Sequence, residues 1–111
     1  MSDRIKKINE LIKQKLNSLI IKEVEFSKDA LVTITHVDTS KDLRHSNIYV
    51  SVLPKILAKE SIDALYKASL HSILYKKLTI KPLPKLHYRL DKTEEKASEI
   101  ERLLDQIKNN G

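Results

Sequence analysis

The stretch "TITHVDTSKDLRHSNIYVSVL", residues 33–53, decides the fold of this chain. At both of its ends apolar and polar side chains alternate, which is the period of a strand with one buried face. The segment between them, residues 38–46, is rich in Ser, Thr and Asp, which form turns by bonding their own backbone. We therefore predict two strands, residues 30–37 and 47–53, paired antiparallel across this turn.

Helical periodicity flanks the strand pair. Residues 2–21 repeat apolar side chains every three or four positions, which predicts a helix with one buried stripe. The stripe contains Ile5, Ile8, Ile12, Leu16 and Leu19. Residues 59–80 return to this spacing until Pro82 and Pro84, because proline ends a helix. Residues 93–111 predict a final helix with Thr93 as its N-cap.

A third strand is predicted for residues 85–91, where the alternation returns. We expect Leu86, Tyr88 and Leu90 to face inward, and Tyr66 also to lie in the core. Because a long helical crossover precedes this strand, we expect it to pair in parallel with one of the other two.

The predicted order is α-β-β-α-α-β-α, which indicates an α+β fold with a three-stranded mixed sheet and helices packed on one face. We expect residues 1–111 to form a single domain. A small mixed sheet with a helix pair is the topology of KH-type RNA-binding domains. The extra helix and strand on the N-terminal side correspond to the type II arrangement.

Composition narrows the function classes. The single glycine is Gly111, so the sequence holds no P-loop, Rossmann fingerprint or nucleophile elbow. No cysteine is present, which excludes a disulfide framework and a thiolate zinc site. No Ser/His/Asp arrangement stands out, so we expect neither an enzyme nor a cofactor. No apolar run is long enough to cross a membrane, and the first residues do not have the apolar stretch of a secretory signal. We therefore expect a cytoplasmic protein.

Charge points to a polyanionic partner. The net charge is +6, and residues 67–89 contain no Asp or Glu. This acid-free stretch covers the predicted helix pair and last strand, where KH-type domains meet RNA. Our main candidates for RNA contact are Lys67, Lys76, Lys77 and Lys81, followed by Arg4, Lys7, Arg44 and His71. Lys85 and Arg89 could instead occupy the open face of the sheet. The simpler interpretation is a solvated basic face.

A metal site is the rival hypothesis. His36, Asp38, Asp42 and His45 are metal-capable ligands within ten residues. Ser, Thr and Asp are also what a hairpin connection requires, so we favour a turn without metal.

The sequence resembles the ribosome-binding factor A family of bacterial small-subunit maturation factors. The first matching block consists of Val37, Ser40, Asp42, Leu43, Tyr49, Val50 and Ser51. The second block consists of Lys81, Pro84, Leu86, Tyr88 and Asp91. The resemblance covers almost the whole chain in the right order.

The resemblance implies a monomeric, non-catalytic assembly factor. Such a factor binds the immature small (30S) ribosomal subunit, assists 16S rRNA maturation near its 5′ end and then dissociates. A release partner such as an assembly GTPase or an initiation factor is implied as well. Two alternatives stay open: a general basic RNA-binding KH-like module, and a dimer formed through the final helix.

One departure concerns the bend between the two middle helices. The family has an Ala-x-Gly kink there, matched here by Ala68, Ser69 and Leu70. Either Leu70 or, in a second register, Ala68 occupies the glycine position. Because a left-handed residue other than glycine is strained, we expect a shallower bend.

Overall fold

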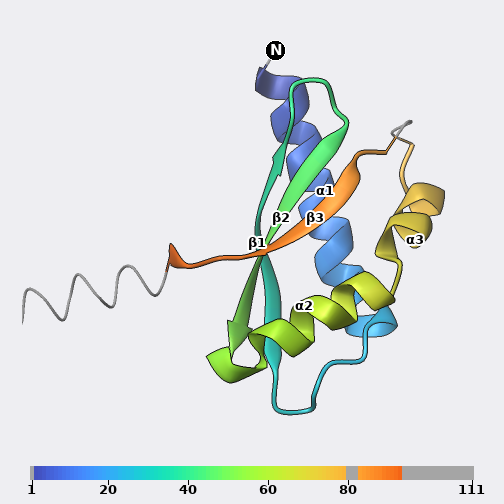
Figure 1. Cartoon of the computed structure of the whole chain (residues 1–111). Coiled ribbons are helices and arrows are strands. Elements are labelled where there is room, and N and C mark those ends of the chain that lie inside the picture. The colour runs from blue at the N-terminus through green and yellow to red at the C-terminus, as the bar shows by residue number, and fades with distance from the viewer. Residues whose placement is uncertain (1, 80–82, 94–111) are drawn as a thin grey trace, which may run out of the picture.

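The computed structural model describes residues 2–79 and 83–93. Its elements, in chain order, are α1 (Ser2–Glu23), β1 (Leu31–Thr39), β2 (His45–Leu53), the short 3-10 helix η1 (Lys55–Leu57), α2 (Ala58–Lys67), α3 (Leu70–Lys77) and β3 (Lys85–Leu90). The predicted order is confirmed through the third strand (Figure 1). The predicted final helix lies, beyond Thr93, outside the described residues.

The sheet has the strand order β1-β2-β3. β1 and β2 pair antiparallel, and β2 and β3 pair in parallel, so the sheet is mixed as predicted. Both strands of the hairpin reach further into the polar segment than predicted, to Thr39 and from His45. The reason is a tight turn, in which the Ser40 N–H donates to the His45 carbonyl at 2.8 Å. Behind it the Thr39 and Ser46 hydroxyls, both buried, bond one another at 2.7 Å.

A β-bulge interrupts the alternation in β1. Ile34 pairs with Val50 and His36 pairs with Tyr49, which leaves Thr35 as the extra residue. The bulge shifts the period, so that Ile34 and Val37 both face the core. It also directs the Thr35 hydroxyl to the Asp91 carboxylate, to which it donates at 2.6 Å.

The core lies between the helices and one face of the sheet. The α1 stripe is confirmed: Ile8, Ile12, Leu16 and Leu19 are buried. On the sheet side the largest contributions come from Ile34, Ile48 and Val50, and α2 and α3 add Leu65, Leu70 and Leu74. The alternate residues of the three strands are exposed or half-buried, which leaves the opposite face of the sheet open.

Asn17 fixes α1 against the outer edge of β1. Its side-chain amide donates to the Ile34 carbonyl at 3.0 Å and accepts from the Ile34 N–H at 2.9 Å. An edge strand presents unpaired backbone groups, and Asn17 satisfies two of them.

Two of the predicted core positions are wrong. Tyr66 is 51% exposed and Leu90 is 38% exposed, whereas Tyr88 is 8% exposed as predicted. Tyr66 lies at the C-terminal end of α2 beside the edge strand, and Leu90 is the last residue of β3. Among the described residues no further strand pairs with the outer side of β3, so neither side chain is covered from there.

Candidate nucleic-acid interface

The corner between α2 and α3 is made by one residue. Ser69 has φ 51° and ψ 48°, in the left-handed region, while Ala68 stays in the right-handed helical region. The expectation of a shallower bend without a left-handed residue is therefore wrong. Serine adopts this conformation at a cost of about 1–2 kcal/mol, which the burial of Leu70 immediately after it offsets.

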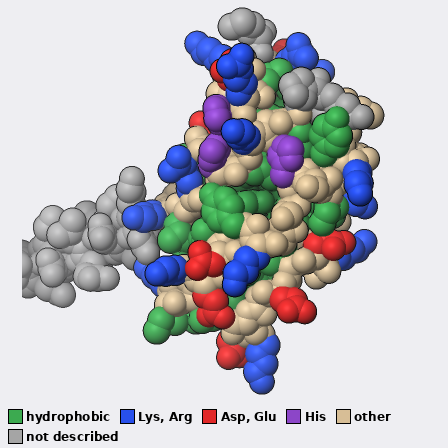
Figure 2. Space-filling model, turned by 45° about the vertical axis from the view of Figure 1, so that its right-hand side comes forward, with side chains coloured by type: hydrophobic (Ala, Val, Ile, Leu, Met, Phe, Trp, Pro, Cys, Tyr) green, Lys and Arg blue, Asp and Glu red, His purple; other side chains and the backbone are tan. Residues whose placement is uncertain are grey.

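A groove lies between this corner and β3. Its volume is about 470 Å³, and among the described residues no carboxylate lines it. The lining residues are Leu65, Tyr66, Ser69, Leu70, His71, Lys85, Leu86, His87 and Tyr88. Figure 2 shows apolar side chains at the centre of this face, His, Lys and Arg side chains above them, and most of the Asp and Glu side chains below.

Aromatic rings form part of the groove wall. Tyr66 and Tyr88 meet edge to face, with ring centroids 4.9 Å apart. Burial raises the pKa of the Tyr88 hydroxyl above its ordinary value, and the neighbouring Tyr66 adds to the shift. Since Tyr66 keeps half of its surface exposed, it can offer a ring face to an unstacked base.

Five of the predicted cationic contacts lie on three described segments. Arg4 and Lys7 lie near the start of α1, Arg44 in the β1–β2 turn, and Lys76 and Lys77 in the last turn of α3. All five are exposed. Figure 1 shows the start of α1 and the β1–β2 turn at the upper end of the molecule, and α3 lower and to the right. His71 lines the groove itself, with its Nε2 3.5 Å from the Leu83 carbonyl oxygen.

The remaining two predicted cations are not placed in this group. Lys67 lines a different concavity, of about 850 Å³, in which four carboxylates lie: Glu23, Glu25, Glu60 and Asp63. Lys67 therefore shares a concavity with four acids and is not among the residues that line the groove. Lys81 lies outside the described residues.

Sequence reasoning missed several groove residues. Tyr66 was expected in the core, and His87 was not singled out. Lys85 reaches the groove, whereas Arg89 stays on the open face of the sheet, where its Nε donates to the Asn47 side-chain oxygen at 2.9 Å. The alternation in residues 85–91 could have indicated Lys85 and His87, because outward-facing side chains of an edge strand can border a groove.

The metal hypothesis finds no support in the geometry. The His36 ring packs on Tyr49 with centroids 5.6 Å apart, while His45 turns to His87. Asp42 accepts from the Ser40 hydroxyl at 2.6 Å, a bond that lowers the pKa of its carboxyl below the ordinary value. Across residues 2–79 and 83–93 no three His, Asp or Glu side chains converge as metal ligands.

The described part of the chain also contains no helix long and apolar enough to cross a bilayer.

A mixed three-stranded sheet, helices on one of its faces and a tight corner between α2 and α3 define a KH-like fold. The sequence profile of the ribosome-binding factor A family matches residues 4–104, and the chain belongs to that family.

Individual relatives agree with this assignment. The chain is 35% identical to ribosome-binding factor A of Dehalococcoides mccartyi strain BAV1, over 96% of this chain and 94% of the relative. It is 38% identical to that of Burkholderia lata, over 87% and 74%. It is 35% identical to that of Chlamydia caviae, over 95% and 92%.

A solved structure shares the fold. The solution NMR structure of a Thermotoga maritima protein, a candidate ribosome binding factor A, superposes with a TM-score of 0.58. The two chains are 24% identical, and the match covers 77% of this chain and 88% of the other.

Proposed function

We propose that this protein binds the immature small (30S) ribosomal subunit through its 16S rRNA, assists maturation of the rRNA near its 5′ end and then dissociates. The observation that carries the proposal is the groove at the α2–α3 corner, which has an aromatic wall, cationic neighbours and no carboxylate among its described lining residues. The relatives' names, ribosome-binding factor A, support a ribosomal partner.

Two kinds of contact contribute to RNA binding in this proposal. Exposed lysines on α3, Lys76 and Lys77, attract phosphates, which supplies affinity without reading sequence. The half-exposed ring of Tyr66 and the apolar groove beside it accept an unstacked base. Binding in such a groove requires a single-stranded segment, because paired bases are not accessible to it.

The protein acts here as a non-catalytic factor. It holds one arrangement of the rRNA more tightly than another and so shifts the population toward it. We expect it to work as a cytoplasmic monomer and a single domain, with release driven by a partner such as an assembly GTPase or an initiation factor.

Co-sedimentation tests the proposal. The wild type and a Lys76→Ala/Lys77→Ala variant are run on sucrose gradients with purified immature 30S subunits, mature 30S subunits and 50S subunits. Wild type should travel with immature 30S particles, and the variant should shift to the top of the gradient.

The matched control is Lys22→Ala/Lys28→Ala. It removes the same charge from exposed positions outside α3. If both variants lost the same amount of binding, the interaction would depend on the net charge of the protein and not on the position of these lysines. Equal binding of wild type to 50S and 30S particles would favour a general RNA-binding module, and no binding to any particle would reject a ribosomal function.

A further inference from the structure

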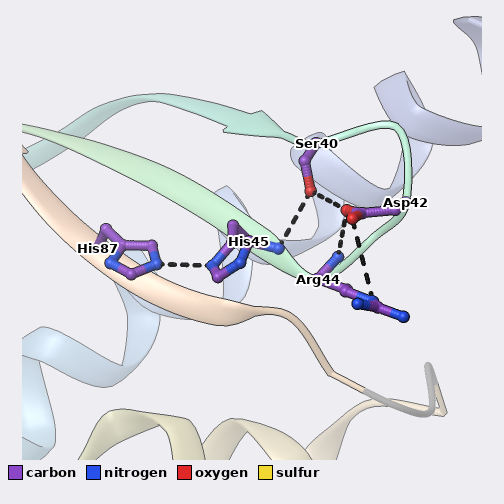
Figure 3. Close-up of polar contacts among 5 residues, drawn as sticks. All are labelled: Ser40, Asp42, Arg44, His45 and His87. Atoms are coloured by element: carbon purple, nitrogen blue, oxygen red, sulfur yellow. Dashed lines mark hydrogen bonds and ion pairs between the residues drawn. The ribbon is translucent and has the colours of Figure 1, made fainter.

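Two histidines from different strands form a pair at the hairpin end of the sheet. The Nδ1 atom of His45 lies 3.0 Å from the Nε2 atom of His87, and the ring centroids are 5.1 Å apart (Figure 3). The register explains the contact: His45 is aligned with Lys85, and His87 follows two positions later on the same face. The pair therefore depends on the parallel alignment of β2 and β3.

The hydrogen bond restricts how many protons the pair can hold. An N–H···N bond needs a proton on one nitrogen and a lone pair on the other. The pair can take up one extra proton at an outer nitrogen and keep this bond. A second extra proton would put N–H groups on both facing nitrogens and like charges on both rings. The pair can therefore carry one positive charge and keep this hydrogen bond, but not two.

The elements around the pair carry both signs of charge. The cations are Arg44, Lys85 and Arg89, the acids are Asp38 and Asp42, and the further histidines are His36 and His71.

The acid closest along the chain is already engaged. Asp42 accepts from the Ser40 hydroxyl and the Arg44 N–H, and Ser40 in turn accepts from the His45 N–H at 3.1 Å (Figure 3). The Arg44 guanidinium lies only at 4.0 Å from Asp42, with both side chains well exposed. A phosphate placed beside the pair would favour its protonated form.

We propose that the His45–His87 pair, flanked by Arg44 and Lys85, is a proton-dependent phosphate contact of the RNA-binding surface. RNA binding is then accompanied by uptake of one proton, so that affinity increases as pH falls through the range in which histidines titrate, about pH 8 to 5. The inference rests on the proposed RNA-binding function and adds the β2–β3 end to the contacts of α3. His87 joins the two parts, because it also lines the groove.

The test is fluorescence anisotropy with a labelled single-stranded oligouridylate, whose bases and phosphodiesters do not titrate in this range. Dissociation constants are measured for the full chain at several pH values and constant ionic strength. The variants are His45→Gln/His87→Gln, which keeps polarity and removes titration, and His36→Gln as the matched control on the same open face. Circular dichroism at each pH checks folding.

Wild type and His36→Gln should bind more tightly as pH falls, with a change that approaches tenfold per pH unit for one proton. The double variant should show a nearly flat profile. A flat profile for wild type with measurable binding would overturn the inference and leave RNA binding intact. A pH dependence that persists in the double variant would also overturn it. Absence of binding at every pH would overturn the RNA-binding function and, with it, the inference.

Discussion

The hydroxyl oxygen of Tyr66 accepts a hydrogen bond from the backbone N–H of Tyr88 at 3.0 Å. This bond connects the end of α2 to β3, which among the described residues pairs with another strand on one side only. It satisfies a backbone donor that would otherwise template pairing with another chain. It also holds the Tyr66 ring beside the groove, so one contact serves stability and the shape of the site.

Replacing Tyr66 with Phe should lower the free energy of unfolding by about 1–2 kcal/mol, because the Tyr88 N–H loses its partner in a largely buried setting. Urea denaturation followed by circular dichroism measures the change. Tyr49→Phe is the control, since among the described residues the Tyr49 hydroxyl makes no hydrogen bond, and its effect should stay within about 0.5 kcal/mol. Equal stability of the two variants would show that the Tyr66 bond contributes nothing. Because the phenylalanine ring of the Tyr66→Phe variant keeps the aromatic surface, this variant should still bind RNA.

Replacing Ser69 with Gly should stabilise the protein by about 0.5–1 kcal/mol. Glycine removes the cost of the left-handed conformation, and its larger unfolded-state entropy cancels part of that gain. Ser69→Ala is the control, because the serine side chain makes no capping hydrogen bond there, and we expect little change. Thermal unfolding compares the three proteins. A destabilised glycine variant would contradict the left-handed assignment.

Local periodicity was sufficient for the elements and for most of the core. The stripe of α1 and the pairing of the hairpin follow from spacings of three, four and two, which depend only on near neighbours in the chain. The parallel pairing of β3 followed from the length of its crossover. These features need no knowledge of how distant segments align.

The features that could not be predicted from the sequence depend on how distant segments of the chain align. Local pattern does not reveal which strand lies at the edge, and so Tyr66 and Leu90 were expected in the core. The contact between His45 and His87 depends on the β2–β3 register across 42 positions. The left-handed turn at Ser69 was missed because the conformation was considered too costly for serine. The composition showed that the protein is basic. Only the fold shows that Lys67 lines a concavity with acids whereas Lys76 lies in the last turn of α3.

Removing the charges of Lys76 and Lys77 should change the salt dependence of RNA binding as well as its strength. Each phosphate contact to a single strand contributes about 0.7 to the slope of log affinity against log salt, so the double alanine variant should lose about 1.4. Anisotropy titrations with the same oligouridylate at several salt concentrations give the slope. The Lys22→Ala/Lys28→Ala variant should keep the wild-type slope. An unchanged slope in the first variant would place the phosphate contacts elsewhere.

Replacing Thr35 with Val should raise the pKa of Asp91. The Thr35 hydroxyl is the main cause of its lowered pKa, with the Thr93 hydrogen bonds second. Because the folded-state pKa lies below the ordinary 3.8, Asp91 stabilises the fold above about pH 4, and this contribution is lost as pH falls through the folded value. Side-chain carboxyl NMR titration should show a higher midpoint for Asp91 in the variant and an unchanged one for Asp42, whose partner is Ser40.

Stability should follow the same direction. The difference in unfolding free energy between wild type and Thr35→Val should be larger at pH 6 than at a pH below the folded-state pKa of Asp91, because there neither protein keeps a charged Asp91. Thr33→Val, on an exposed position of β1, controls for the loss of a hydroxyl from this strand. A difference that is independent of pH would mean that the bulge at Thr35 contributes through packing and its bond to the Tyr49 carbonyl, and not through the carboxylate.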